Sequence, residues 1–241
     1  MKRTLEDLQY KDLKMMQEEG LFRFGTDAVL LASFCDVKQK DTVVDLGTGT
    51  GIIPLLLSAR TGCRVIGVEI QERAAQLAGE NVSLNSLEDR IQIICEDMRT
   101  LKLNETRINA VVCNPPYEKA GSGGVSTTEE IRIARHEVMC TLEDCVTAAS
   151  RLLSTGGKLF MIHRSERAAE LIYLMHKHRL EPKKLRAIQA YEGRDPRYVL
   201  IMAVKDASAG LKLAAPLIIY KPDGSYTDEM NKIYHREGNN E

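Results

Sequence analysis

The stretch Val43-Val44-Asp45-Leu46-Gly47-Thr48-Gly49-Thr50-Gly51 decides the fold of this chain. Its first part predicts a buried strand, and the apolar residues 52–59 predict a helix directly after the glycines. Alternating glycines let the backbone turn and approach a ligand closely, while the amides at the start of the helix face a polar or anionic group. The stretch therefore predicts a cofactor-binding corner between a strand and a helix.

The acids around this corner indicate which cofactor it binds. A second predicted strand, Val65-Ile66-Gly67-Val68, ends in Glu69, where an acid accepts hydrogen bonds from both hydroxyls of a ribose. The glycines lack the Gly-x-Gly-x-x-Gly spacing of dinucleotide folds, and Asp45 would repel a diphosphate. It would suit an ammonium group. A ligand with both an ammonium and a ribose is S-adenosylmethionine, so the pattern predicts a methyltransferase.

A later motif, Asn114-Pro115-Pro116-Tyr117, follows the apolar residues 110–113, which predict another buried strand. Each proline fixes its own φ and restricts the preceding residue, so the carbonyl groups have few directions in which to point. We expect the Asn114 side-chain oxygen and the Pro115 carbonyl to accept hydrogen bonds from a substrate amine, and Tyr117 to stack on a base. By itself the tetrapeptide is also compatible with an ordinary turn at a strand end.

Together these motifs resemble the class I Rossmann-like methyltransferases that carry an Asn-Pro-Pro-Tyr motif and methylate exocyclic or amide nitrogens. Residues 23–27, 133–137 and 216–234 are similar to the bacterial tRNA(Val) adenine-N6 methyltransferases. The resemblance implies S-adenosylmethionine-dependent methylation of the exocyclic N6 of an adenine in RNA. An anticodon-loop adenine of tRNA is the expected target, because an exposed loop base leaves its stack at little cost.

The predicted site has a catalytic and a cofactor-binding part. The catalytic residues are Asn114, Pro115 and Tyr117. Asp45 and the glycine bend are expected to hold the methionine end of the cofactor, and Glu69 its ribose. By resemblance, Asp97 contacts the adenine amine and the segment around Phe24 closes over the cofactor, although Asp97 could be a solvated acid and Phe24 a core residue. The full cofactor-binding set is Thr26, Asp27, Asp45, Gly47, Thr48, Gly49, Gly51, Glu69, Asp97, Met98 and Asn114.

The order of apolar runs predicts an α/β fold. Strands are expected at residues 42–46, 64–69, 91–95, 109–113 and 157–163, with helices at 142–153, 168–178 and after Glu69. The runs 184–191 and 197–204 are too close for a parallel crossover and predict a C-terminal antiparallel hairpin. The resemblance then implies a Rossmann-like class I methyltransferase with a seven-stranded, mostly parallel sheet and helices on both faces.

One domain is expected over residues 1–235. It would comprise an N-terminal segment covering cofactor and substrate (1–40), the Rossmann-like core (41–205) and a C-terminal extension (206–235), followed by a tail (236–241). The 241 residues, 44% of them apolar, suffice for one such core. No apolar run approaches a membrane span or a signal peptide, so a cytoplasmic protein without membrane contact is expected.

Composition indicates little else about partners. The six cysteines form no Cys-x-x-Cys pair, and His176 and His178 would point to different sides of a helix, so we expect reduced cysteines and no metal. A net charge of −1 gives no global attraction to a polyanion. Two local basic clusters, at residues 2–14 and 177–186, could contact RNA or simply be solvated faces. Residues 118–126 could form a lid over the site or an ordinary surface loop. Arg135 and His136 could meet a phosphate.

Other functions are compatible with parts of this pattern. A protein glutamine offers the same two amide hydrogens as adenine N6, so methylation of a release factor is the closest alternative. DNA adenine methylation is a further one, although no target-recognition domain is evident. A catalytically inactive nucleic-acid-binding module is disfavoured by the intact Asp45, Glu69 and Asn114, and an NAD-dependent oxidoreductase by the glycine spacing.

Overall fold

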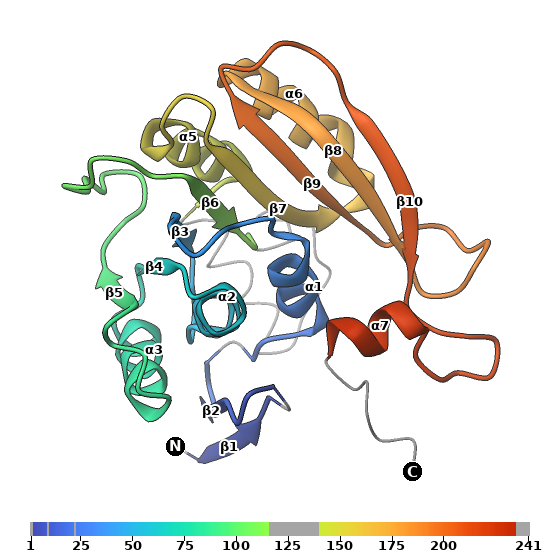
Figure 1. Ribbon diagram of the computed structural model, residues 1–241. Coiled ribbons are helices and arrows are strands. Elements are labelled where there is room, and N and C mark those ends of the chain that lie inside the picture. Colours follow the sequence, from blue (N-terminus) through green and yellow to red (C-terminus); the bar gives the residue numbers. More distant parts are fainter. Residues whose placement is uncertain (1, 9, 22, 116–139, 235–241) are drawn as a thin grey trace, which may run out of the picture.

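The computed structural model describes residues 2–8, 10–21, 23–115 and 140–234 (Figure 1). Pro116 and Tyr117 lie outside the described residues, as do the predicted lid at 118–126, Arg135, His136 and the tail 236–241.

A mostly parallel sheet of eight strands forms the centre of the described structure, in the order β10-β8-β9-β7-β6-β3-β4-β5 (Figure 1). The strands from β3 to β7 run parallel, and β9 is antiparallel to both β7 and β8. Their bounds are β3 Thr42–Leu46, β4 Arg64–Glu69, β5 Ile91–Cys95, β6 Ala110–Cys113, β7 Lys158–Arg164, β8 Leu180–Gln189, β9 Tyr198–Lys205 and β10 Lys212–Ile218. The predicted α/β class and the C-terminal hairpin, β8–β9, are thereby confirmed.

The sheet has one strand more than the seven expected. The additional strand is β10, which lies parallel to β8 at the sheet edge and comes from the segment assigned to a C-terminal extension. Its pairing register shifts between Ala214 and Leu217, and Pro216 lies within that irregularity. A proline cannot donate a backbone hydrogen bond to a sheet and is tolerated only at edges and bulges, which fits the position of β10. A proline also argues against a strand in the sequence, so β10 was not expected.

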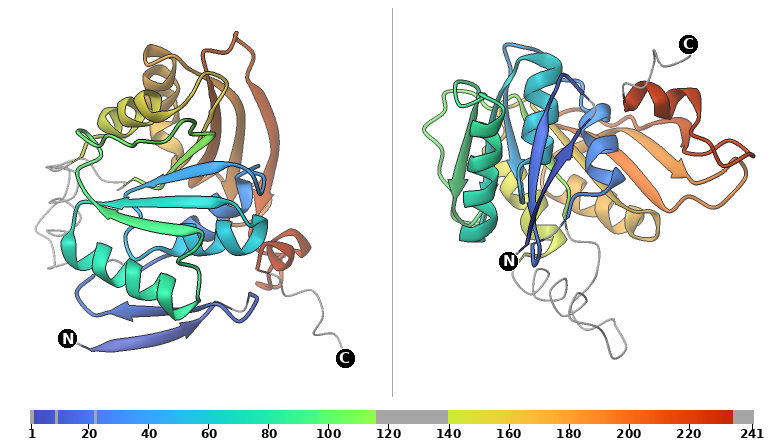
Figure 2. Two further views of the ribbon diagram at one scale, coloured as in Figure 1. Left: turned by 60° about the vertical axis from the view of Figure 1, so that its left-hand side comes forward. Right: turned by 90° about the horizontal axis from the view of Figure 1, so that it is seen from below.

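Helices cover both faces of the sheet, as Figures 1 and 2 show. On one face lie α1 (Thr26–Phe34), α2 (Ile52–Thr61) and α7 (Asp228–Ile233), whose apolar residues join Phe160 of β7 in one core cluster. On the other lie α5 (Leu142–Leu152) and α6 (Ala168–Lys177), which pack against Met161 in a second cluster. Because successive strand residues point to opposite faces, Phe160 and Met161 serve different cores and the strand must be apolar throughout.

Local sequence explains where several helices begin and end. Thr141 and Asp144 form a capping box at the start of α5, where each side chain bonds to the other residue's backbone amide. Helix α2 ends at Gly62, which has a φ of +75°. Pro54 is tolerated in α2 because it occupies the first turn, where an amide has no helical acceptor. Among the described residues, no helix is both long enough and apolar enough to span a membrane.

An N-terminal hairpin that the sequence did not predict packs outside α3 (Glu72–Leu84), as Figure 2 shows. It consists of β1 (Arg3–Asp7) and β2 (Lys14–Glu18). The side chain of Glu18, only 1% exposed, accepts hydrogen bonds from Arg3 and from Arg73 of α3, and these two guanidinium groups lower the pKa of Glu18 to about 2. The hairpin is therefore fastened to the helix that follows the second core strand.

Candidate active site

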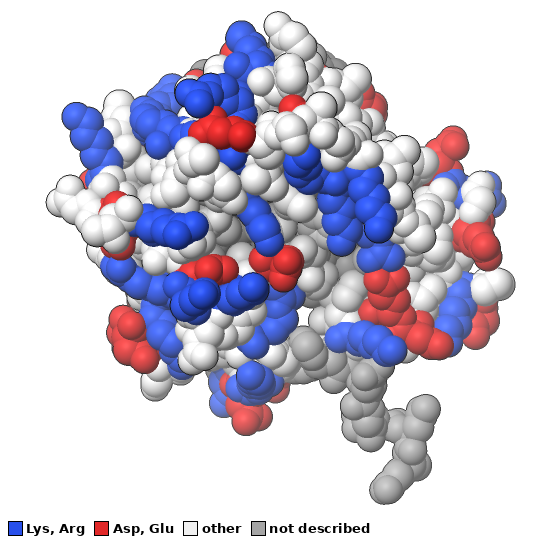
Figure 3. Space-filling view, turned by 45° about the horizontal axis from the view of Figure 1, so that its top comes forward, with Lys and Arg blue, Asp and Glu red and all other residues white. Residues whose placement is uncertain are grey.

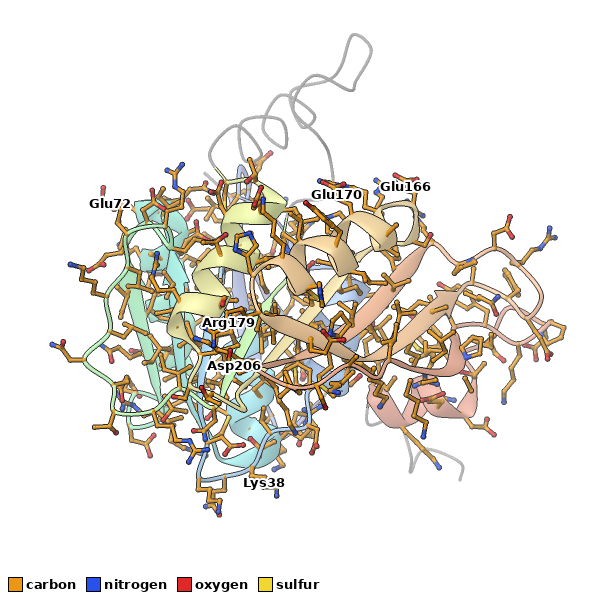
Figure 4. The ribbon with its side chains drawn as sticks, turned by 90° about the horizontal axis from the view of Figure 1, so that it is seen from above. Lys38, Glu72, Glu166, Glu170, Arg179 and Asp206 are labelled. Atoms are coloured by element: carbon orange, nitrogen blue, oxygen red, sulfur yellow. The ribbon has the colours of Figure 1, made fainter. Side chains whose placement is uncertain are left out.

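The glycine bend and the Asn114 motif lie at the same edge of the sheet. Strands β3 and β6 are parallel neighbours with Leu46 opposite Cys113, so Gly47 and Asn114 follow adjacent strand ends. Figure 4 shows Glu72 and Glu166, which follow β4 and β7, along one edge and Lys38, which precedes β3, at the opposite one. Ligands of open α/β folds bind at the edge formed by the carboxyl ends of the strands.

The glycine bend depends on glycine for two reasons. Gly47, Gly49 and Gly51 have φ values of +73°, +56° and +92°, in the left-handed region that strains other residues. At Gly51 a Cβ would also lie 3.3 Å from the Cβ of Ala78 on α3, so the helix packs directly on the bend. The Gly47 and Thr48 amides both donate to the Val68 carbonyl, at 2.9 and 3.0 Å, which fixes the bend against β4.

Asp45 is fully buried beside the bend, and neither of its carboxylate oxygens has a hydrogen-bond partner within the described structure. The buried Thr48 hydroxyl also has none there. Burial raises the pKa of Asp45 to about 7. The nearby Thr48 hydroxyl opposes this rise, although it is not in hydrogen-bond geometry, and the charge of Glu69 adds to it. Unsatisfied buried acceptors are costly, and an ammonium group would satisfy them. The amino-acid end of S-adenosylmethionine fits this position.

Glu69 joins the glycine bend to the start of α3. Its side chain accepts a hydrogen bond from the Gly49 amide at 2.9 Å through one oxygen and from the Gln71 amide at 3.0 Å through the other. The residue is 6% exposed. Each carboxylate oxygen can accept a second hydrogen bond, so Glu69 is able to hold the bend and also receive a hydroxyl donor.

Asp97 and Met98 lie on the turn after β5. Both oxygens of Asp97 accept from the Arg99 guanidinium, at 3.0 and 2.9 Å from Nε, and this pairing lowers the pKa of Asp97. Asp97 is therefore paired with an arginine, and its contact with an adenine amine stays a prediction. Met98 reaches the bend, because its Cε lies 3.9 Å from where a Cβ on Gly47 would be. Arg151 holds the turn by donating to the carbonyls of Met98 and Arg99, each at 2.6 Å.

Asn114 contacts a residue that the sequence assigned to the cofactor. Its Nδ2 donates to the Asp27 carboxylate at 2.9 Å, and Asp27 lies in the first turn of α1. Because an ionised carboxylate only accepts hydrogen bonds, the amide nitrogen must face Asp27 and the amide oxygen is turned away from it. Pro115 is buried next to it. Thr26, the neighbour of Asp27, meets the Tyr234 hydroxyl at 3.3 Å.

One buried residue that supports the bend was missed by the sequence analysis. Asn81 of α3 is fully buried, and its Nδ2 donates to the Thr50 carbonyl of the bend and to the Met16 carbonyl of β2, each at 3.0 Å. Its Oδ1 accepts from the Met16 amide at 2.7 Å. A polar residue within the apolar stripe of that helix was the signal that could have revealed it.

Three thiols lie behind Asn114. The Sγ atoms of Cys140 and Cys145 are 3.5 Å apart, and Cys145 interacts with Cys113, the residue before Asn114. The hydrogen bond with Cys145 and burial raise the pKa of Cys140, while the interaction with Cys113 and burial raise the pKa of Cys145 against an opposing effect of Cys140. All six cysteines are free. Within the described ranges no group of three His, Cys, Asp or Glu side chains is arranged to hold a metal ion.

The two basic clusters predicted as possible RNA contacts are largely engaged within the protein. Lys177 pairs with Glu143, Arg179 with Asp206 (labelled in Figure 4) and Arg186 with Glu229. In the N-terminal cluster, Arg3 pairs with Glu18 and Glu80, and Lys11 donates to the Ala59 carbonyl. Figure 3 shows basic side chains in separate groups with acidic ones between them on the face in view. The structure favours a structural role for these clusters.

Comparison with known proteins identifies the family. A profile of the methyltransferase small domain matches residues 13–182. A tRNA1(Val) (adenine(37)-N6)-methyltransferase of Porphyromonas gingivalis is 30% identical over 93% of this chain and 91% of its own length. Its counterpart in Haemophilus influenzae is 29% identical over 94% of this chain and 97% of its own length.

Among solved structures, a predicted O-methyltransferase of Agrobacterium tumefaciens superposes with a TM-score of 0.71, 24% identity and coverage of 87% of this chain and 95% of the other. A geranyl diphosphate C-methyltransferase of Streptomyces coelicolor, solved with S-adenosyl-L-homocysteine, superposes with a TM-score of 0.55 and 18% identity over 75% of this chain and 77% of the other. At these identities the structures confirm the fold alone.

The chain belongs to the methyltransferase small domain family, and the resemblance to tRNA(Val) adenine-N6 methyltransferases is confirmed. It is an S-adenosylmethionine-dependent methyltransferase, as the motifs around Asp45 and Asn114 predicted.

Proposed function

We propose that this methyltransferase modifies the exocyclic N6 of an adenine in RNA, and that its substrate is an anticodon-loop adenine of tRNA. The observation that carries the proposal is the placement of the Asn114 amide, held by Asp27, at the strand end next to the glycine bend. The relatives that cover almost the whole chain are named for adenine 37 of tRNA1(Val).

The proposed cofactor site uses Asp45 for the ammonium, the backbone from Gly47 to Gly51 for the methionine end, and Glu69 for the ribose. Two observations support these assignments: the Asp45 oxygens have no hydrogen-bond partner among the described residues, and each Glu69 oxygen can accept a bond beyond the one that it makes there. Bound S-adenosylmethionine supplies an electrophilic methyl group on a sulfonium. A carboxylate that binds the ammonium gains a charge-assisted hydrogen bond at oxygens that no described residue satisfies.

The proposed role of Asn114 and Pro115 is to orient the substrate amine. The lone pair of an adenine N6 is delocalised into the ring, so two acceptors that bind its hydrogens favour the pyramidal geometry of the transition state. No strong base is needed for this. Tyr117, which lies outside the described residues, is proposed to stack on the base.

Asp27 is proposed as the positioning residue for Asn114. An asparagine amide presents oxygen on one side and nitrogen on the other, and a flip would aim two donors at an amine that also donates. The carboxylate of Asp27 binds the nitrogen and thereby fixes the oxygen in the accepting orientation. Preorganised acceptors of this kind cost no rearrangement during the reaction.

Within this proposal residues 1–235 act as one domain: the N-terminal segment supplies Asp27, the core supplies Asp45 and Asn114, and the C-terminal extension supplies Tyr234. A tRNA substrate is consistent with the predicted cytoplasmic location.

The test uses tRNA from bacteria that lack the modification, incubated with the enzyme and labelled S-adenosylmethionine, followed by nucleoside analysis. We expect N6-methyladenosine at one anticodon-loop position. Asn114→Ala should abolish the label while S-adenosylmethionine still binds. The matched control is Asn104→Ala, at an exposed residue in the loop before β6 at the opposite edge. Label in protein glutamine, with none in tRNA, would contradict the proposal.

A further inference from the structure

Four tyrosines from the C-terminal half of the chain form one row of contacting rings, in which three rings are stacked and the outermost is tilted by 36° against its neighbour. Tyr191 contacts Tyr220 at 5.5 Å between ring centroids, Tyr220 stacks on Tyr226 at 5.4 Å and Tyr226 on Tyr234 at 5.5 Å. The last two pairs are nearly parallel, at 15° and 5°. These four residues are called the tyrosine column below. Its inner end is fixed, because the Tyr234 hydroxyl meets Thr26 beside Asp27.

The column lies at the active-site edge of the sheet. Strand β9 begins at Tyr198, which pairs with Arg164, the last residue of β7, so the turn between β8 and β9 stands at the carboxyl end of the parallel strands. The turn is bound there, because the Ser165 amide and hydroxyl donate to the carbonyls of Arg197 and Pro196. Three strand spacings of about 4.8 Å separate β8 from β6, which is roughly 14 Å across the sheet. The paired strands place Leu185 of β8 level with Cys113, and β8 continues to Gln189, about 13 Å further along. The turn therefore begins roughly 20 Å from the Asn114 strand end. A few nucleotides of single-stranded RNA span that distance.

The outer end of the column is open. Tyr191 is 41% exposed, and among the described residues the ring that it contacts is that of Tyr220. Arg194 and Arg197 follow it in the same turn, and both are exposed. Neither guanidinium has a carboxylate partner within the described structure, in contrast to the paired residues of the two basic clusters. Glu192 and Asp195 share the turn, so its local charge is balanced and the ring is its distinguishing feature.

We propose that the turn at residues 191–197 is a docking surface for single-stranded RNA, with a nucleobase stacked on the open face of Tyr191 and a phosphate bound by Arg194 or Arg197. The inference rests on the proposed RNA substrate and states where that substrate binds outside the active site. Single-stranded loops are recognised by stacking unstacked bases on aromatic rings, while arginines bind the phosphates. A base a few nucleotides from the target adenine in the same loop fits the distance.

The rigid support of Tyr191 strengthens this assignment. A ring whose other face already lies on a stacked neighbour loses little rotational freedom when a base binds, so more of the stacking energy remains as affinity. An isolated exposed tyrosine lacks that advantage. Tyr173 on α6 is such a residue: it is 64% exposed and belongs to no aromatic stack among the described residues.

The experiment compares steady-state methylation of tRNA by wild type, Tyr191→Ala, Tyr191→Phe and the control Tyr173→Ala. We expect Tyr191→Ala to raise the KM for tRNA about tenfold, within the range for one stacked base, with kcat changed less than twofold. Tyr191→Phe keeps the ring and should behave as wild type, as should Tyr173→Ala. The affinity for S-adenosylmethionine and the Tm should stay unchanged in all four proteins.

Each other outcome has a distinct meaning. An unchanged KM in Tyr191→Ala, with wild type active on tRNA, overturns the docking surface and leaves the proposed function intact. A fall in kcat without a change in KM overturns it too, because it assigns the column to support of Thr26 and Asp27. A wild-type enzyme that methylates no RNA refutes the proposed function itself.

Discussion

Replacing Asp45 by asparagine should stabilise the ligand-free protein while destroying its affinity for S-adenosylmethionine. In the folded chain burial raises the pKa of Asp45 from 3.8 to about 7, since no group of the described structure satisfies its oxygens. A carboxyl whose folded pKa lies above its unfolded value loses stability as pH rises between the two values. At about 1.36 kcal/mol per pKa unit the full cost is about 4 kcal/mol, reached above pH 7.

Asparagine is neutral at every pH and carries no such cost. The difference in unfolding free energy between Asp45→Asn and wild type should therefore grow with pH, by about 2.5 kcal/mol between pH 5 and pH 8. Taking the difference between the two proteins cancels the carboxyl groups that they share.

The assay is urea denaturation of both proteins at pH 5 and pH 8, each with and without saturating S-adenosylmethionine. Wild type should gain stability from the cofactor, and more at pH 8 than at pH 5, whereas the variant should gain none. Equal pH dependence in the two ligand-free proteins would show that Asp45 is already satisfied in the folded state. The reasoning about a position reserved for an ammonium would then be wrong.

Three further predictions concern residues that hold the site. Asp27→Asn should lower kcat at least tenfold with little change in the KM for tRNA, because the introduced amide can bind either the oxygen or the nitrogen of Asn114. Asp27→Glu keeps the carboxylate and should recover part of the loss. Equal losses in both variants would indicate that Asp27 binds the cofactor. Gly67→Ala should destabilise the protein by about 1–3 kcal/mol in thermal denaturation, since its Cβ would lie 2.8 Å from Ile93 Cδ1 and 3.0 Å from the Thr48 side chain. Glu18→Gln should increase hydrogen exchange in β1 and β2 at pH 7. The wild-type hairpin should lose its protection from exchange only as the pH falls from 4.5 toward about 2, the range in which Glu18 becomes protonated. Unchanged exchange in the variant would show that the two arginines do not hold the hairpin on α3.

Much of the core could be predicted because each motif there carries its own physical constraint. The glycine bend requires left-handed backbone at Gly47, Gly49 and Gly51, and the parallel strands are buried on both faces, so their apolar runs are nearly continuous. The strand bounds at residues 42–46, 64–69 and 91–95 agree with the structure to the residue.

The remaining features depend on contacts between distant parts of the chain. Asp27 and Asn114 are 87 positions apart, and neither residue's local pattern reveals the hydrogen bond between them. The N-terminal hairpin and the edge strand β10 lack a strong alternating pattern, because tertiary contacts with α3 and with β8 stabilise them.

Pro216 has a consequence for how copies of this protein behave in concentrated solution. The outer border of β10 would otherwise offer a regular row of amide and carbonyl groups to any second chain, which is the usual start of sheet-to-sheet aggregation. The proline has no amide hydrogen to donate and the register shifts beside it, so β10 is a poor template for pairing with a second chain.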